Sequence, residues 1–407
     1  MRRYIIIAAI VLAVLGIGVA AYLYFFVDTT NVAVAPVGDT SFPVAGPGAP
    51  GTETTNGTLG APASAPVAVS ARLVKISAGP VVPGVAVVNN KAVSASSSPP
   101  SSLGTGDVAV KYIERQSGNV YVYLTRAKTL TRTSNRTIPG IQSAAWLPDA
   151  SLAFVRYLSG TDFSTINSYA LPASGSGGFF LSQNLSDIAV SSTNILTLAS
   201  GVSGSVASLM RTDGTRASEI FTTPLSSLRI AFAGKNRYLA FTKPAYALSG
   251  SAFLIDGTGR FSRVAGPSNG LVAKASPSGK WVLVSSVFGG VMQMELVNTA
   301  TGESLSLPVA TIADKCVWAA DDSAIYCGIP TSPSASFNYP DDWYQGAVSF
   351  SDRIWKIQVS GRYAQLVLDF SKENGGVLDA EALALDPLNT MLAFINKNDG
   401  SLWVYSL

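Results

Sequence analysis

The 407-residue sequence contains no histidine and two cysteines. Without histidine it cannot build a Ser-His-Asp or Cys-His catalytic group, or a metal site with an imidazole ligand. Carboxylates remain available for catalysis, because a pair of Asp or Glu side chains can hydrolyse a glycosidic bond. No motif marks such a pair, so the sequence predicts no catalytic residue, no metal ligand and no cofactor site.

The densest group of side chains suited to recognition lies in residues 331–352, TSPSASFNYPDDWYQGAVSFSD. Aromatic side chains offer a large contact area at a low cost in conformational entropy, so we expect a binding surface here. The alternative, which stays equally open, is a loop that folds its aromatic rings back into a small satellite core. Two adjacent aspartates do not supply the spaced series of oxygen ligands that calcium needs. The candidate binding residues are Phe337, Tyr339, Asp341, Asp342, Trp343, Tyr344 and Phe350.

Cys316 and Cys327 are the two cysteines, and they flank a predicted hairpin turn. If Asp321 and Asp322 are the central turn residues, the two thiols face each other across the strand pair. Facing residues in antiparallel strands are close enough for a disulfide. We therefore predict a structural disulfide, while a slipped turn or a pair of buried thiols stays possible.

Strand–turn–strand units position these residues. The clearest unit is LVAKASPSGKWVLVSS at 271–286, where two apolar runs flank a Ser-Pro-Ser-Gly turn. Looser copies follow at intervals of roughly 43 residues, which is typical of a β-propeller with one four-stranded blade per repeat. One interval is longer, and residues 331–352 account for the excess. By strand count this insertion joins the second and third strands of blade six, on the face that carries the blade-to-blade connections.

The strand count also predicts how the ring closes. The seventh unit supplies three strands, while residues 72–77 form one unassigned strand at the other end of the repeat region. Joining the two removes exposed sheet edges. We therefore predict an all-β fold, a seven-bladed β-propeller spanning residues 71–407.

The turn sequences SPSGKWVLV, LPDASLAFV and DPLNTMLAF resemble the TolB-type propeller repeat, in which Trp-Ser-Pro-Asp-Gly precedes an Ile-Ala-Phe strand. WD-repeat propellers are a more distant likeness. Trp stands before the turn only at Trp146 and Trp318, and Asp follows Pro only at Asp149. The resemblance covers about 72–407 and implies a propeller fold. Its members include binding modules, envelope factors and accessory domains of hydrolases, so it implies no active-site residue.

The amino-terminal segment predicts a membrane anchor. Arg2 and Arg3 precede residues 4–27, which carry no charge and are long enough to cross a bilayer as a helix. No Lys or Arg follows until Arg72, so we expect residues 1–27 to be a transmembrane signal-anchor with a cytoplasmic amino terminus. A cleaved signal peptide is the alternative, with 33–35 (AVA) as its cleavage site.

Residues 28–70 are rich in Pro, Gly, Ala and Thr and predict a disordered linker. The net charge of +3 is too small to indicate a nucleic-acid partner. Together these features predict a membrane-tethered, extracytoplasmic propeller, periplasmic or on the cell surface, that acts as a binding or assembly module for a protein or ligand. The alternatives are a glycosidase-like, carboxylate-dependent hydrolase at the channel mouth and a structural component of an envelope complex.

Overall fold

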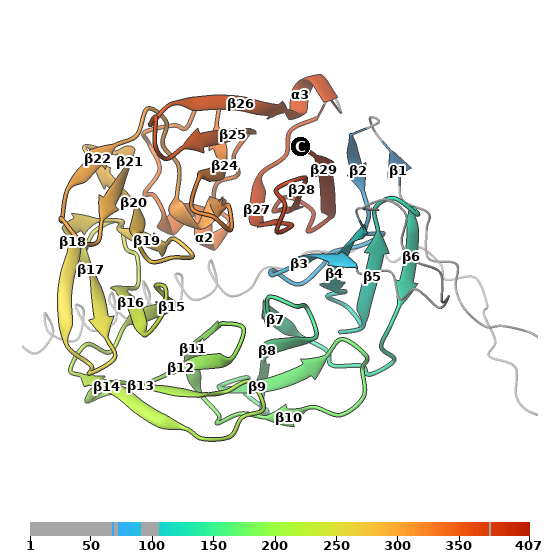
Figure 1. The fold of residues 1–407 in the computed structure, drawn as a ribbon, viewed down its shortest axis with the longest axis horizontal. Coiled ribbons are helices and arrows are strands. Elements are labelled where there is room, and N and C mark those ends of the chain that lie inside the picture. The colour runs from blue at the N-terminus through green and yellow to red at the C-terminus, as the bar shows by residue number, and fades with distance from the viewer. Residues whose placement is uncertain (1–66, 69–71, 91–105, 374–375) are drawn as a thin grey trace, which may run out of the picture. The chain divides into compact units, whose positions relative to one another are not determined.

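Seven antiparallel sheets form a ring around a central channel (Figure 1). The computed structural model describes residues 67–68, 72–90, 106–373 and 376–407, which belong to one unit, Gly60–Leu407. The prediction of an all-β, seven-bladed propeller is confirmed. The predicted anchor and most of the predicted linker lie outside the described residues. Within the described residues, no helix has the length and apolar character needed to cross a membrane.

Blades 1 to 6 each take four consecutive strands, ordered from the channel outward. Blade 1 contains β3 (Ala86–Asn90), β4 (Asp107–Ile113), β5 (Val120–Leu124) and β6 (Thr129–Arg132). Blade 2 contains β7 (Ile141–Trp146), β8 (Leu152–Ser159), β9 (Thr165–Pro172) and β10 (Phe179–Phe180). Blade 3 contains β11 (Leu185–Val190), β12 (Asn194–Gly201), β13 (Gly204–Arg211) and β14 (Ser218–Thr223).

The second half of the ring continues in the same way. Blade 4 contains β15 (Leu228–Phe232), β16 (Arg237–Thr242), β17 (Ser249–Asp256) and β18 (Phe261–Asn269). Blade 5 contains β19 (Val272–Ala275), β20 (Trp281–Phe288), β21 (Val291–Asn298) and β22 (Ser304–Ser306). Blade 6 contains β23 (Cys316–Trp318), β24 (Ala324–Pro330), β25 (Asp352–Gln358) and β26 (Ala364–Asp369), with the 3-10 helix η1 (Ala313–Lys315) before it and α3 (Phe370–Glu373) after it.

Blade 7 joins strands from opposite ends of the repeat region. Its sheet contains β27 (Ala380–Leu385), β28 (Met391–Asn396) and β29 (Leu402–Ser406), and then β2 (Leu73–Lys75). Leu73 faces Tyr405 and Lys75 faces Trp403 in this antiparallel pair. The predicted closure by residues 72–77 is therefore confirmed. A two-residue strand, β1 (Val67–Ala68), extends the sheet by pairing with β2.

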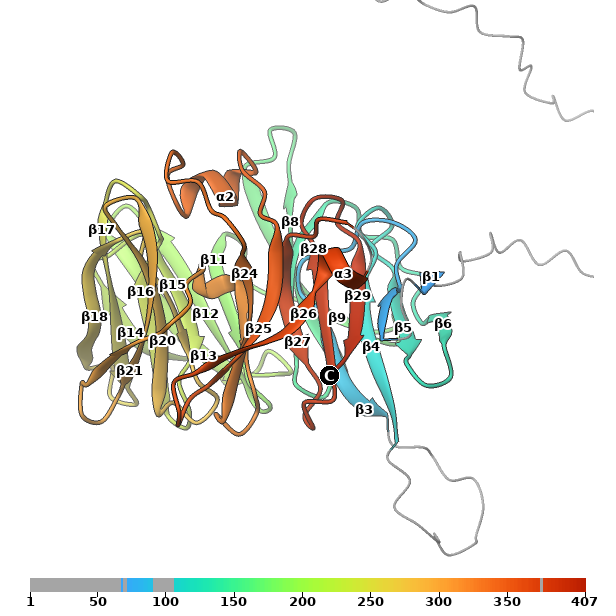
Figure 2. The same ribbon diagram turned by 90° about the horizontal axis from the view of Figure 1, so that it is seen from above.

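The two faces of the ring differ in the connections that they carry. Because neighbouring strands run antiparallel, the loop between the second and third strands of a blade lies at the same end as the connection to the next blade. We call this end the insertion face, since residues 331–351 lie there between β24 and β25. The opposite end carries the first hairpin turns, such as 276–280, and is called the turn face. Figure 2 shows α2 (Asp341–Gln345) and the β8–β9 connection projecting on the same side.

The core lies between the blades. All seven residues of β24 and four of the six in β16 are buried, because each second strand is covered on both sides by neighbouring blades. This two-sided burial removes the alternation of apolar and polar residues that marks a half-exposed strand. It explains why the hairpin turns, rather than the strand pattern, carry the clearest repeat signal.

The register of the β23–β24 hairpin places Cys316 opposite Cys327. Their Cα atoms are 4.1 Å apart, and the two sulfur atoms form a disulfide. The Asp322 N–H donates to the Ala319 oxygen at 3.1 Å, so the central turn residues are Ala320 and Asp321, one position earlier than predicted, and Asp322 follows with a positive φ of 61°. The predicted pairing is confirmed, and the disulfide joins the innermost strand of blade 6 to its neighbour.

Candidate functional site

The blade 6 insertion folds down onto the mouth of the channel and contacts several blades. The backbone N–H of Tyr246, in the loop between β16 and β17 of blade 4, donates to the carboxylate of Asp341 at 3.1 and 3.2 Å. The carboxylate of Asp342 accepts the N–H of Asn338 at 2.7 Å, a bond within the insertion itself. Both acidic side chains therefore stabilise the loop.

Three of the five aromatic side chains proposed for binding are buried. Tyr339 is 1% exposed, and Trp343 and Phe350 are each 3% exposed. The rings of Trp343 and Phe350 stack with their centroids 6.4 Å apart, and Tyr339 lies 5.4 Å from Phe350. In this structure they give a partner no accessible surface, because they belong to the same buried apolar cluster as residues of blades 4, 5 and 6. Phe337 is partly buried, which leaves Tyr344, at 38%, as the most exposed of the five.

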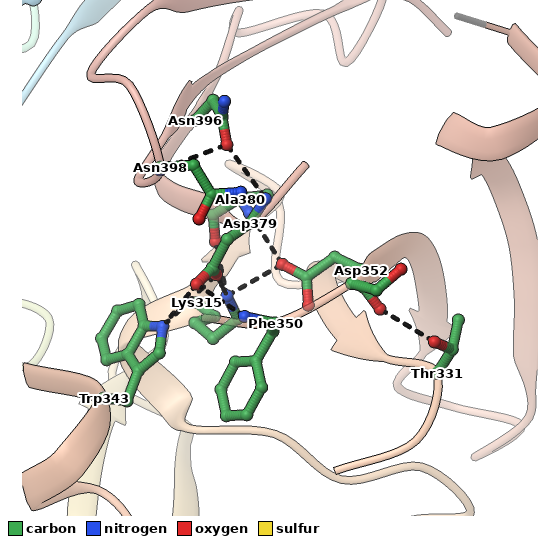
Figure 3. A network of polar contacts seen from close by, with 10 residues as sticks. Lys315, Thr331, Trp343, Phe350, Asp352, Asp379, Ala380, Asn396 and Asn398 are labelled. Carbon is green, nitrogen blue, oxygen red and sulfur yellow. Dashed lines mark hydrogen bonds and ion pairs between the residues drawn. The ribbon is translucent and has the colours of Figure 1, made fainter. Parts of the chain in front are cut away.

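Beneath these rings lies a group of buried ionic side chains, the Lys315 cluster, which consists of Lys315, Asp352 and Asp379 (Figure 3). All three side chains have 0% exposure. The Lys315 ammonium contacts Asp379 Oδ1 directly and lies 2.8 Å from Asp352 Oδ2. It also donates to the backbone oxygen of Ala380 at 3.0 Å. Because isolated charges are costly in a protein interior, this pairing is what allows a lysine to be buried there.

Backbone and indole N–H groups satisfy most of the carboxylate oxygens in the Lys315 cluster. Asp379 Oδ2 accepts from Trp343 Nε1 at 3.0 Å and from the N–H of Phe350 at 2.9 Å. Asp352 Oδ2 accepts the N–H of Ala380 at 2.7 Å, whereas Asp352 Oδ1 is buried without a hydrogen-bond partner. Burial raises the pKa of Asp352 to about 6, against the opposing effect of Lys315.

No sequence pattern singles out Lys315 or Asp379. They are 64 residues apart, and each precedes the first strand of a blade: Lys315 ends η1 before β23, and Asp379 precedes β27. The only sequence relation between them is the repeat, which places each of them just before the first strand of a blade. Each residue type is common at a surface, so nothing in the sequence indicates that both side chains are buried.

A second ionic group lies next to the Lys315 cluster. Arg229 of β15 binds both carboxylate oxygens of Asp314, at 2.6 and 3.2 Å, and the Tyr344 hydroxyl donates to Asp314 at 2.6 Å. Burial acts to raise the pKa of Asp314, but Arg229 and Tyr344 outweigh it and the net pKa is lowered. These contacts connect α2 to blade 4 across the channel mouth.

Neither ionic group presents a catalytic carboxylate pair to a substrate in this structure. Asp352 and Asp379 share one lysine and have no exposed side-chain surface. Asp314 is neutralised by Arg229. In the part of the chain that the structure describes, no group of three or more histidine, cysteine, aspartate or glutamate side chains could hold a metal ion.

Exposed apolar side chains gather at the loops of the insertion face in blades 2 to 5. We call this region the apolar loop face; it comprises the connections 160–164, 181–184, 202–203, 224–227, 243–248, 270–271, 289–290 and 307–312 with the strand ends beside them. Asp162 and Lys243 are the only charged residues in these eight connections. The exposed large apolar side chains of this region are Leu158, Phe163, Val202, Leu225, Leu248, Phe288 and Val291.

At the turn-face end of the channel lies an apolar cavity of about 350 Å³, lined by residues that include Trp146, Trp318 and Leu383. Both indole N–H groups are already bonded, to the backbone oxygens of Gly84 and Lys274. The one ionisable lining residue, Asp386, accepts three backbone N–H groups, those of Leu388, Thr390 and Met391. The cavity therefore has an apolar wall, and its one carboxylate serves the adjacent turn.

No protein-family model and no curated protein sequence matches this chain. Solved structures do match. An oligogalacturonate lyase from Vibrio parahaemolyticus aligns over 74% of this chain and 86% of its own at 10% identity, with a TM-score of 0.52. An oligogalacturonate lyase in complex with manganese aligns over 84% and 95% at 10% identity, with a TM-score of 0.54.

TolB from Acinetobacter baumannii aligns over 74% of this chain and 64% of its own at 13% identity, with a TM-score of 0.39. The two lyase matches, at 10% identity, show a shared propeller fold and transfer no residue role. The manganese of the lyase is not transferred either, because a match at 10% identity shows the fold alone.

Proposed function

We propose that this chain is a membrane-tethered, extracytoplasmic binding module that holds a protein partner on its apolar loop face. The observation that carries the proposal is the gathering of exposed apolar side chains at eight connections of blades 2 to 5 that contain only two charged residues. Phe163, Leu248 and Phe288 are 66, 70 and 76% exposed, and each comes from a different blade. Depletion of charge around aromatic and aliphatic side chains is typical of the core of a protein interface.

The partner should carry a matching, largely uncharged surface. Two charged residues in the eight connections cannot attract a polyanion or an anionic membrane surface strongly. Tyr344 lies beyond blade 5, at α2, with its hydroxyl fixed by Asp314. It extends the contact surface toward the insertion, and so part of the predicted role of residues 331–352 is kept. The buried rings of Tyr339, Trp343 and Phe350 support that surface from below.

Two features support the extracytoplasmic location. The uncharged run of residues 4–27 follows Arg2 and Arg3, which favours a cytoplasmic amino terminus with the propeller on the other side. The Cys316–Cys327 disulfide is of a kind that persists in oxidising compartments and is rare in the cytoplasm.

The proposal is tested by placing charge on the apolar loop face. We expect the full chain with Phe163→Asp, Leu248→Asp and Phe288→Asp to lose the partner that the wild type captures from membrane extracts of its own source. Each anchor residue should cost about 2 kcal/mol or more. The matched control is Leu388→Asp, since Leu388 is 60% exposed beside the turn-face cavity.

The control variant should retain the partner. If the triple variant captures the same protein as the wild type, the apolar loop face is not the binding surface. If the triple variant and the control both lose the partner, the effect is not specific to that face, and the proposal also fails. Thermal unfolding of each variant shows that the comparison is made between folded proteins.

A further inference from the structure

The Lys315 cluster brings an amine and a carboxyl group together in a site closed to water. We propose that Lys315 and Asp379 become joined by an intramolecular isopeptide bond between Lys315 Nζ and Asp379 Cγ, with Asp352 as the proton carrier. The bond would fasten the entry to blade 6 covalently to the entry to blade 7. This modification is independent of the partner proposed above.

The first argument is proximity. Lys315 Nζ contacts Asp379 Oδ1, and both side chains are held in place by their own blades (Figure 3). Lys315 ends the short helix η1, and the backbone N–H of Asp379 is fixed by Asn396 Oδ1 at 3.1 Å. Holding two reacting groups in this way makes their reaction effectively unimolecular, which can replace the energy that a free amine and acid would need from an activating agent.

The second argument is the set of donors on Asp379. Trp343 Nε1 and the N–H of Phe350 both donate to Oδ2, at 3.0 and 2.9 Å. They would stabilise the negative charge that develops on Oδ2 when the amine attacks Cγ, as donors in an oxyanion hole do. Oδ1, which faces the lysine, is then the oxygen that leaves. Asp352 has no comparable pair of indole and backbone donors, so Asp379 is the better electrophile.

The third argument is that Asp352 is placed to move the protons. Its Oδ2 lies 2.8 Å from Lys315 Nζ, within hydrogen-bond reach of the proton that the amine must lose. Its Oδ1 is buried without a partner, an arrangement that suits a carboxyl group in its neutral form. Burial also raises the pKa of Asp352 to about 6, so near neutral pH the ionised group can take the amine proton and, once protonated, can return it to the leaving oxygen.

The atoms and charges balance without any other reactant. The Lys315 ammonium carries three hydrogens, of which one stays on the amide nitrogen and two leave with Asp379 Oδ1 as water. The Nζ–Cγ bond forms and the Cγ–Oδ1 bond breaks. Asp352 carries both protons from Nζ to Oδ1, the first before the amine attacks and the second before water leaves, so it ends in its starting state. The positive charge of the ammonium and the negative charge of the carboxylate disappear together, which removes one buried ion pair.

The surroundings also fit the product. The rings of Trp343 and Phe350 lie 4.8 and 5.0 Å from Nζ and keep water away from the site. The amide oxygen, which derives from Oδ2, would keep its two donors. The remaining N–H can donate to the backbone oxygen of Ala380, which already lies 3.0 Å from Nζ.

Mass spectrometry of the purified full chain tests the bond. After reduction of the disulfide, we expect the mass to be lower than that of the sequence by one water molecule. Digestion should give a branched peptide that joins the segments around Lys315 and Asp379, with no tryptic cleavage after Lys315. Lys315→Arg, which keeps the positive charge, should show no water loss. Lys274→Arg, which changes another lysine near Asp314, should keep the loss.

Asp352→Asn separates the roles within the cluster, because it leaves both reacting groups in place. We expect this variant to have an intact Lys315 and no water loss. If it loses water as the wild type does, Asp352 is not the proton carrier. The wild-type measurement decides the main proposal and does not depend on the folding of any variant. A mass equal to that of the sequence, with cleavage after Lys315, would overturn the isopeptide bond.

Discussion

Burial of the Asp352 side chain favours its protonated form over the ionised form that an aspartate has in solution near neutral pH. Ionised Asp352 would leave one uncompensated negative charge in the Lys315 cluster, because Lys315 and Asp379 neutralise each other, whether as an ion pair or as the amide proposed above. Protonation of Asp352 removes that charge, and burial accordingly raises its pKa to about 6. The proton is bound more tightly in the folded protein than in the unfolded chain, where the pKa is near 3.8. Folding therefore takes up a proton in the window between these two values.

The sign of the resulting pH dependence follows from linkage. Between pH 4 and 6 the folded state binds more protons than the unfolded state, so the free energy of unfolding falls as pH rises. A rise in pKa from 3.8 to about 6 corresponds to ~3 kcal/mol, fully lost above pH 6. We expect wild type to have a higher transition temperature at pH 4.5 than at pH 7, and Asp352→Asn to lose most of the difference. Calorimetry at both pH values measures it, and equal differences in the two proteins would contradict the assignment.

At the scale of elements, the blade 6 insertion is part of the core of the propeller and is not only a surface loop. A loop with five aromatic residues suggests a binding surface from the sequence, yet Tyr339, Trp343 and Phe350 are buried. We therefore expect removal of residues 331–352 to destabilise the propeller. Removal would expose Lys315 and its carboxylates to water and break the contacts of α2 with blades 4 and 7.

Trp343 and Tyr344 are neighbours in α2 that differ in burial, so their substitution compares a buried side chain with a partly exposed one. Trp343→Ala should lower the free energy of unfolding by about 3–5 kcal/mol, because it removes a buried ring and opens a cavity over Lys315. Tyr344→Ala should cost about 1 kcal/mol, the scale of one hydrogen bond, since its ring is already partly exposed. Denaturant unfolding measures both values. Trp343→Phe, which keeps most of the ring but loses the bond to Asp379, should fall between them. Equal effects of the two alanine variants would contradict the buried role of Trp343.

The sequence predicted the elements better than the site, for a physical reason. Hairpin turns depend on a few neighbouring residues, so Pro277 and Gly279 indicate a turn wherever they occur. The strand register of Cys316 and Cys327 follows from the same local geometry. Burial depends instead on what other blades supply. Lys315 is buried because Asp379, 64 residues away, lies against it, and Trp343 covers both. No local sequence pattern indicates that these three side chains lie together.

At the scale of the whole molecule, the ring depends on β2. Leu73 and Ile76 are almost fully buried, and the Ser77 hydroxyl accepts the N–H of Leu402 at 2.8 Å. Without this strand, β29 would become an exposed edge in a ring whose other blades are complete. The closing strand therefore contributes to the stability of the entire propeller, although it is three residues long.

Deletion of residues 72–77 tests this dependence. We expect the shortened protein to aggregate or to lose its cooperative thermal transition, because blade 7 loses its fourth strand and its buried contacts. Deletion of the equally long segment 40–45, within the predicted linker, controls for shortening and should leave the transition unchanged. A shortened protein that melts like wild type would show that the ring does not need β2.

The position of β2 has a mechanical consequence. In the sequence it follows the predicted anchor and linker, so a pull on that predicted tether would reach β1 first and then the pairing of β2 with β29. That pairing is the one place where the ring is held shut by strands from opposite ends of the repeat region. A pull from a membrane would therefore act on the pairing of β2 with β29, the seam of the ring, before it acted on any other blade. Blade 7, which carries this seam, is also the blade whose Asp379 contacts Lys315 at the entry to blade 6.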